Sequence, residues 1–312
     1  MEIRFTLKSI GFIVILMVPV FWVASFDKHV LEPENINLSR IIDARNHLEL
    51  DYLVVGNSYG YSSLYPPLFD SLEIDIYNYG TPGAGVLMYE LMINDFLNCL
   101  GGKTSNVILT ISPTIFSVGG DDWGANPYHR YLNCPQSSAK MLIEDLNLEK
   151  LLKATQSGFV RGLFYLRSNE RSNHSEILNA SEDYKGFYHR YDTFSTKYYQ
   201  ENKHLYQKYL DDNFKDRSRE RLINILSSLK KRGINPIVIE TPTNKLTDFF
   251  NEEFLSEYSN TLDEIERKGY KLVRNKLYLD STYYRDIDHV NYFGASVFTA
   301  NLINMLGLEN LD

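Results

Sequence analysis

The chain has 312 residues, of which 44% are hydrophobic, so it can bury a core as one large domain or two small ones. Its formal net charge of −8 argues against a nucleic acid or an anionic lipid surface as the main partner. Aromatic residues make up 13% of the chain, with 23 tyrosines.

An uncharged apolar run lies near the N-terminus. Residues 9–26, "SIGFIVILMVPVFWVASF", are about the shortest run that spans a bilayer as a helix. Arg4 and Lys8 precede it and Asp27 follows it, which favours residues 1–8 as a cytoplasmic tail. The alternative is a cleavable signal peptide with "VAS" at its cleavage site, but the run exceeds the usual ~7–15 residue signal core. We therefore expect a single-pass protein of the inner (cytoplasmic) membrane whose bulk is extracytoplasmic.

Strand and helix patterns alternate after a polar linker at residues 27–48, and we expect one domain over residues 49–312. Apolar runs predict strands over residues 52–55, 74–77 and 106–112, and apolar spacing of three and four predicts a helix over residues 86–97. Alternation of this kind is typical of a parallel sheet with crossover helices. The first half of the domain is therefore predicted to be α/β.

The pattern loosens over about residues 120–215, which we interpret as an insertion with helices near residues 138–155 and 196–209. The alternation then resumes with a helix that ends at Gly233, a glycine typical of helix C-termini. The elements expected after the insertion are helix 219–231, strand 235–241, helix 254–269, strand 270–275 and a last helix within 288–306.

Two polar clusters follow predicted strands, where parallel sheets place their ligand sites. The first, "GNSYG", contains Ser58; the second, "YYRDIDHVNYFGA", contains Asp286, Asp288 and His289. A serine needs a base to act as a nucleophile at neutral pH, and a histidine oriented by a carboxylate supplies it. Asp286 lies three residues before His289, whereas Asp288 is adjacent, where side chains tend to diverge. Asp286 is therefore the preferred orienting residue. Ser58 taken alone is better explained as a helix cap, and its pairing with the second cluster favours catalysis.

"VVGNSYG" together with "DIDH" resembles the SGNH/GDSL hydrolase superfamily, closest to membrane-anchored bacterial members related to polysaccharide O-acetyltransferases and teichoic-acid D-alanyl transfer proteins. The resemblance implies a three-layer α/β/α, flavodoxin-like fold in which Ser58 is the nucleophile, His289 the base and Asp286 the orienting acid. It also implies an oxyanion hole formed by the backbone N–H groups of Ser58 and of a glycine in "NYGTPGAG". Gly83 is the best match for that glycine, with Gly80 as the alternative.

The sequence departs from the family pattern at two places. The aspartate before the serine is Asn57 here, and the third block, which usually supplies an oxyanion-hole asparagine, is "TISPTIF" without one. Ser112, Thr114 or Asn126 is the replacement donor to be considered. The loss of one such donor typically costs ~2.7–4 kcal/mol of transition-state stabilisation.

We therefore expect an exported, membrane-anchored serine esterase or O-acyltransferase that acts on an envelope polysaccharide through an acyl-serine intermediate. The alternative is a non-catalytic SGNH-like module that binds or scaffolds polysaccharide assembly. The expected substrate is an acylated glycan or a small ester, with envelope-biosynthesis partners and no nucleic acid. No cofactor or metal is implied. The sequence does not decide whether Cys99 and Cys134 form a disulfide.

Overall fold

The computed structural model describes residues 43–117, 185, 187, 191–202, 204, 213–244 and 246–309. They belong to one compact unit, which comprises Asn37–Cys134 and Glu182–Asp312. The predicted membrane span at 9–26, the predicted helix at 138–155 and Asn126 lie outside the described residues. Within the described part, no helix combines the length and apolar character that crossing a bilayer requires.

A five-stranded, fully parallel sheet forms the centre of the unit, in the order β2-β1-β3-β4-β5. The strands are β1 (Glu49–Val55), β2 (Ile76–Asn78), β3 (Lys103–Ile111), β4 (Asn235–Glu240) and β5 (Lys271–Val273). This is the flavodoxin-like order. The chain adds β2 on one side of β1 and then adds β3, β4 and β5 on the other side, so the order of strands reverses between β1 and β3. The predicted parallel α/β sheet is confirmed, and ligands of such sheets bind beyond the carboxyl ends at the reversal.

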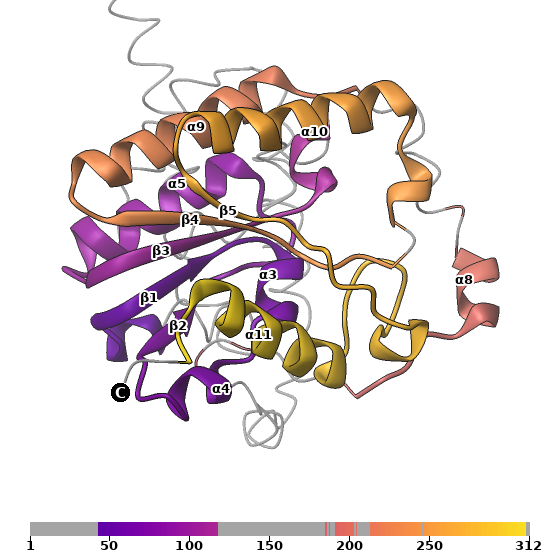
Figure 1. Ribbon diagram of the computed structural model, residues 1–312, viewed down its shortest axis with the longest axis horizontal. Coiled ribbons are helices and arrows are strands. Elements are labelled where there is room, and N and C mark those ends of the chain that lie inside the picture. The colour runs from indigo at the N-terminus through magenta and orange to yellow at the C-terminus, as the bar shows by residue number, and fades with distance from the viewer. Residues whose placement is uncertain are drawn as a thin grey trace, which may run out of the picture. The chain divides into compact units, whose positions relative to one another are not determined.

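Helices cover both faces of the sheet, giving three layers (Figure 1). One face carries α5 (Val86–Asn94), α9 (Asp216–Lys231) and α10 (Glu252–Arg267). The other carries α3 (Ser58–Ser63), α4 (Pro66–Asp70) and α11 (Tyr292–Leu306). A π-helix, Asp95–Cys99, continues α5, and α8 spans Thr196–Asn202. Short 3-10 helices occupy Ala44–Asn46, Pro113–Phe116, Leu246–Phe249 and Ser281–Tyr283.

The apolar runs of the strands account for the core beneath α11. Side chains from one face of the sheet pack against this helix, and most of them are branched aliphatic residues suited to a doubly covered parallel sheet. The cluster includes Val54, Ile76, Ile108, Ile237, Ile239, Val273, Phe298, Leu302 and Ile303, all nearly inaccessible to solvent. Burying each such side chain contributes roughly 1.5–3 kcal/mol, so the core fixes α11, and the loop before it, against the sheet.

Local signals explain where the predicted elements end. Helix α9 ends as predicted before Gly233, whose φ of 76° suits glycine. The last helix begins at Tyr292, within the predicted segment, because the Asn291 side chain caps it by accepting from the Gly294 N–H at 3.1 Å. Cys99 is disulfide-bonded; Cys134 lies outside the described residues.

Candidate active site

The turn that carries Ser58 connects β1 directly to α3. Asn57, rather than Ser58, caps this helix: its side chain accepts a hydrogen bond from the Tyr59 N–H at 3.1 Å. Ser58 is the first residue of α3 and is partly exposed. Its hydroxyl is therefore not used for capping and remains available for chemistry.

Close packing on β3 holds this turn in place. A Cβ atom added to Gly56 or Gly60 would overlap the Thr110 side chain, so only glycine allows this approach. Behind the turn, the fully buried Tyr89 hydroxyl accepts from the Asn57 N–H at 3.1 Å and donates to the Thr110 carbonyl at 2.9 Å. Tyr89 thus links the Ser58 turn to the neighbouring strand.

The loop that carries His289 closes on itself before α11. Tyr284 and Val290 pair in an antiparallel bridge, and the Arg285 N–H donates to the His289 carbonyl at 3.0 Å. The buried Asn291 amide donates to the Thr282 carbonyl at 2.8 Å while its oxygen caps α11. The loop is therefore anchored at both ends to a helix that packs on the sheet.

The structure brings the three predicted residues together. The distance from His289 Nε2 to Ser58 Oγ is 2.8 Å, and His289 Nδ1 lies 3.0 and 3.1 Å from the two carboxylate oxygens of Asp286. Asp286 is itself held by the His289 N–H at 2.7 Å and by Arg285 Nε at 3.0 Å. With its proton on Nδ1, the imidazole presents a free lone pair on Nε2 to the serine hydroxyl, which is the arrangement of a general base.

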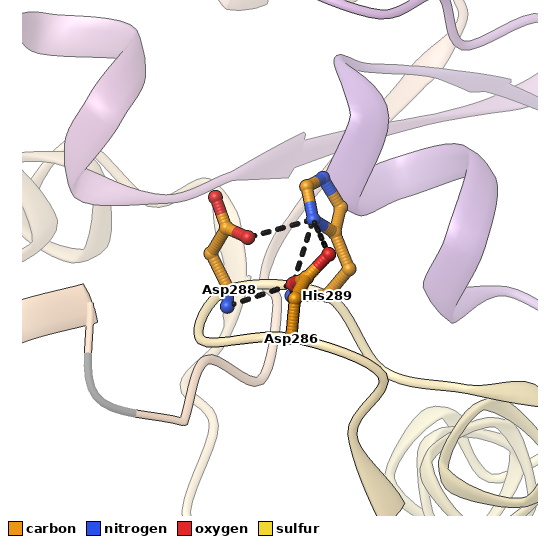
Figure 2. A group of neighbouring side chains, drawn as sticks. All are labelled: Asp286, Asp288 and His289. Atoms are coloured by element: carbon orange, nitrogen blue, oxygen red, sulfur yellow. Dashed lines mark hydrogen bonds and ion pairs between the residues drawn. The ribbon is translucent and has the colours of Figure 1, made fainter. Parts of the chain in front are cut away.

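Asp288 also faces His289 Nδ1 (Figure 2), which the sequence reasoning did not anticipate. Its Oδ1 lies 2.7 Å from Nδ1, and its Oδ2 accepts from the Tyr59 hydroxyl at 3.0 Å. The expectation that the Asp288 side chain diverges from the imidazole was wrong. The Asp288 N–H donates to Asp286 Oδ1 at 3.1 Å, and this turn of the backbone directs both carboxylates toward one nitrogen.

The charges in this cluster shift one another's pKa values. Burial lowers the pKa of His289, but the charges of Asp288 and Asp286 outweigh burial and raise it to about 9. Burial alone would raise the pKa of Asp286, yet the charge of His289 and the hydrogen bonds from His289 and Asp288 hold it well below its usual range. Burial raises the pKa of Asp288, the charge of His289 opposes this rise, and Asp286 adds to it.

The backbone N–H groups of Ser58 and Gly83 are the candidates for binding an oxyanion. Neither the Ser58 N–H nor the Gly83 N–H meets a hydrogen-bond acceptor among the described residues. The Gly83 loop is held against the Ser58 turn because the Thr81 N–H donates to the Gly56 carbonyl at 3.0 Å. By contrast, the Gly80 N–H donates to Asn78 Oδ1 at 3.1 Å, which favours Gly83 over Gly80 as the donor.

At the end of β3, two buried hydroxyls stand where the family pattern has its asparagine. Ser112 Oγ and Thr114 Oγ1 are 2.9 Å apart, so one donates to the other. Only one of the two protons is used in that bond, and the second hydroxyl keeps a proton to donate. Asn126, the third candidate, lies outside the described residues.

The only potential metal ligand set in the described part of the chain is Asp286, Asp288 and His289, whose ligand atoms lie within 4.8 Å of one another. A metal bound there would occupy Nδ1, the nitrogen that must carry the proton if Nε2 is to act as a base. The contact between Nε2 and Ser58 Oγ therefore favours the acid–base assignment.

Sequence reasoning ranked Asp288 below Asp286 as the orienting residue, and it missed two contributors to this geometry, Tyr59 and Tyr89. The Tyr59 ring stacks on the His289 ring, with centroids 4.9 Å apart and planes at 14°. Its position directly after Ser58 was a usable signal, because a residue on the first turn of α3 stays near the nucleophile. Tyr89 carried no such signal, since its contact with Asn57 joins residues 32 positions apart.

Comparison with known proteins gives likenesses of fold only. No protein-family model matches the sequence, and no curated protein is significantly similar to it. Among solved structures, a GDSL-like lipase of Bacteroides thetaiotaomicron VPI-5482 matches 87% of this chain and 98% of its own, with 9% identity and a TM-score of 0.42. A provisionally assigned acylhydrolase of Bacteroides fragilis NCTC 9343 matches 88% of this chain and 97% of its own, with 11% identity and a TM-score of 0.43. A carbohydrate esterase matches 83% of this chain and 69% of its own, with 10% identity and a TM-score of 0.36. At these identities and TM-scores the function has to be argued from the site itself.

Proposed function

We propose that the protein is a serine esterase or O-acyltransferase that cleaves an acyl ester through an acyl-serine intermediate. The observation that carries this proposal is the 2.8 Å contact between Ser58 Oγ and His289 Nε2, with Asp286 bound to the opposite ring nitrogen. A non-catalytic binding module has no need for a serine, a base and an orienting acid in line. The geometry therefore supports the enzyme over the binding module.

In the first half of the reaction, His289 Nε2 takes the proton of Ser58 Oγ as that oxygen attacks the ester carbonyl carbon. The carbonyl oxygen becomes an oxyanion, which accepts hydrogen bonds from the N–H groups of Ser58 and Gly83. When the tetrahedral intermediate collapses, the bond to the alcohol oxygen breaks and the Nε2 proton passes to that oxygen. The products of this half are a free alcohol and an acyl-Ser58.

In the second half, His289 removes a proton from an acceptor hydroxyl, which attacks the acyl-serine. A water acceptor yields a carboxylic acid, and the enzyme is then an esterase; a sugar hydroxyl yields a new ester, and the enzyme is then an acyltransferase. In both cases the proton on Nε2 returns to Ser58 Oγ as the acyl bond breaks, so the site regenerates its starting state.

We further propose an acylated envelope polysaccharide as the substrate. An aromatic group at the start of α11 (Tyr191, Tyr292 and Phe293) supports this choice, because the Tyr191 and Phe293 side chains are 55% and 52% exposed. Tyrosine rings are enriched at binding interfaces, where an apolar ring and a polar hydroxyl can both be used. It begins three residues after His289 in the sequence, on the helix that follows the catalytic loop.

The first experiment tests catalysis with the full chain purified in detergent. The Ser58 hydroxyl should react with a fluorophosphonate probe, and the protein should hydrolyse a chromogenic acetyl ester. Ser58→Ala and His289→Ala should each lose both properties. Ser71→Ala and His204→Ala serve as matched controls, because both change exposed residues whose side chains bond only to nearby backbone carbonyls. Labelling or turnover that is the same in wild type and both site variants would overturn the proposal.

The second experiment tests the glycan. Phe293→Ala and Tyr191→Ala should raise KM for an O-acetylated oligosaccharide several-fold while leaving hydrolysis of the small chromogenic ester unchanged. Tyr278→Ala, at a side chain 93% exposed, is the control. An equal effect of Tyr278→Ala, or no effect of the other two, would contradict a sugar-binding role. Mass spectrometry of an added acceptor oligosaccharide separates acyl transfer from hydrolysis.

The third proposal is that residues 9–26 anchor the protein in the inner membrane, with residues 49–312 extracytoplasmic and close to other envelope-biosynthesis proteins. The uncharged apolar run and its flanking charges support it. The full chain should resist extraction of membranes with alkaline carbonate, and a chain that lacks residues 1–26 should be released. A full-length protein found in the carbonate-soluble fraction would refute the anchor.

A further inference from the structure

We propose that Asp288, held in place by Tyr59, is a second positioning carboxylate for His289, so that two acids rather than one support the base. The inference rests on the proposed function, since it concerns the same reaction. It assigns roles to two residues, Asp288 and Tyr59, for which the triad has no place.

The contacts of Asp288 hold its carboxylate against the imidazole. One carboxylate oxygen lies 2.7 Å from His289 Nδ1, and the other accepts from the Tyr59 hydroxyl at 3.0 Å. The Tyr59 ring in turn stacks on the imidazole at 4.9 Å. Tyr59 therefore touches both members of the pair, and it fixes the ring of one against the carboxylate of the other.

Burial makes this arrangement costly unless a positive charge is present. Asp288 is only 7% exposed, and its Oδ1 receives no hydrogen bond from any described residue. A carboxylate oxygen desolvated in this way strongly destabilises the fold unless a compensating partner is present. The partner that faces it is the imidazole, which becomes positively charged when it accepts the Ser58 proton. The site is thus arranged in advance for the charge that develops during the reaction.

The two carboxylates that face His289 differ in how far neighbouring groups compensate their charge. Arg285 donates from Nε to Asp286 Oδ2 and so offsets part of that carboxylate's charge. Asp288 receives a hydrogen bond from the neutral Tyr59 hydroxyl, so its charge acts on the imidazole with less compensation. The charges of Asp288 and Asp286 both raise the pKa of His289, to about 9. Tyr61 contributes to raising the pKa of Arg285.

The first test is the pH dependence of turnover. Because only neutral His289 can act as a base, kcat/KM of the wild type should rise with pH up to about 9. Asp288→Asn should move this rise down by about one pH unit, as expected when an opposite charge within a few ångströms is removed. Asp280→Asn, at an exposed helix cap eight residues earlier, should leave the profile unchanged. A profile of Asp288→Asn that coincides with wild type would overturn the proposal.

The second test measures whether either carboxylate can orient His289 when the other is replaced. With one orienting acid, an Asp→Asn change costs about 10⁴-fold in kcat in the best-studied triad. Here Asp288 still faces Nδ1 in Asp286→Asn, so that variant should lose about 10²-fold, and the Asp286→Asn/Asp288→Asn double variant about 10⁴-fold. Tyr59→Phe should lower kcat several-fold in wild type and have no further effect in the Asp288→Asn background. If Asp286→Asn alone is as inactive as the double variant, Asp288 has no positioning role.

An NMR titration keeps the inference separate from the proposed function. The imidazole nitrogens of His289, assigned by comparison with His289→Gln, report its pKa without any substrate. That pKa should fall in Asp288→Asn, as it should in Asp286→Asn. A wild type that is inactive but shows this fall would refute the esterase and leave the second carboxylate standing. An unchanged His289 pKa in Asp288→Asn would refute the second carboxylate in an active enzyme.

Discussion

Asn57 caps the helix that begins with Ser58: its side-chain oxygen accepts a hydrogen bond from the Tyr59 N–H, 3.1 Å away. The assignment of the cap to Asn57 matters because a serine at a helix N-terminus is otherwise expected to be the cap itself. With Asn57 in that role, the Ser58 hydroxyl is turned to His289.

Replacing Asn57 should weaken the helix and the nucleophile together. Asn57→Ala removes the cap and should lower the free energy of unfolding by ~1 kcal/mol, while Asn57→Ser or Asn57→Asp should retain most of it. Urea denaturation measures this change. We expect kcat to follow the same order, because the cap orients the first turn of α3. Full activity in a measurably destabilised Asn57→Ala would show that the cap does not position Ser58.

Tyr89→Phe should leave the buried Asn57 N–H without its acceptor. An unsatisfied buried group costs roughly 1–3 kcal/mol, and the variant should lose that much in a denaturant titration. We also expect kcat to fall with KM nearly unchanged, since the Ser58 turn loses its link to β3. Tyr258→Phe removes another buried hydroxyl, which donates to Glu240, and is the control. It should be destabilised without a loss of kcat.

Gly83 and Gly101 form a matched pair for testing the oxyanion donor. Both have positive φ, 64° and 71°, and a Cβ atom added to either would have no neighbour within 4 Å, so alanine adds backbone strain without a clash. Gly83→Ala and Gly101→Ala should each cost about 1–2 kcal/mol of stability. Only Gly83→Ala should lower kcat, because strain there moves the N–H that we propose as an oxyanion donor. Equal kcat in the two variants would remove Gly83 from the mechanism.

The Ser112–Thr114 pair should supply the donor that an asparagine supplies in the resembling family. Thr114→Val or Ser112→Ala removes one hydroxyl of the pair, and the loss of one oxyanion donor typically lowers kcat by about 10²–10³-fold. Thr261→Val removes a buried hydroxyl within α10 and should leave kcat unchanged. Wild-type kcat in both site variants would direct attention to Asn126.

Stability and activity should move in opposite directions with pH. The folded state raises the pKa of His289 from 6.5 to about 9, so protonated His289 stabilises the fold. This contribution is complete below about pH 6.5 and disappears as the pH rises through about 9, whereas activity rises over the same interval. Unfolding free energies at several pH values should show the decline in wild type, and His289→Gln should abolish it. A pH-independent difference between the two would contradict the shift.

Much of the fold follows from local patterns in the sequence. The run around Val54 predicts a buried strand because its neighbours are apolar on both faces, and Gly233 marks the end of α9 because a positive φ is needed there. The strand order needed more, since pairing joins residues as distant as Ile237 and Ile108. It follows from the topology rules of parallel sheets rather than from any single segment.

The candidate site was predictable to the extent that its residues occur in recognisable blocks. Ser58, Asp286 and His289 could be identified from spacing and from the resemblance, and the structure places them in contact. The orientation of Asp288 could not, because it depends on the backbone turn created by the hydrogen bond from its N–H to Asp286. Side-chain direction within a loop is set by such tertiary contacts, which residue spacing does not encode.

The contact between Ser58 and His289 joins residues separated by 231 positions. During synthesis Ser58 is made well before His289. A nascent chain that has not yet reached His289 therefore contains Ser58 without its partner imidazole. On the proposed mechanism Ser58 becomes reactive only after β5 has joined the sheet and α11 has docked, so its labelling by a fluorophosphonate also reports completed folding.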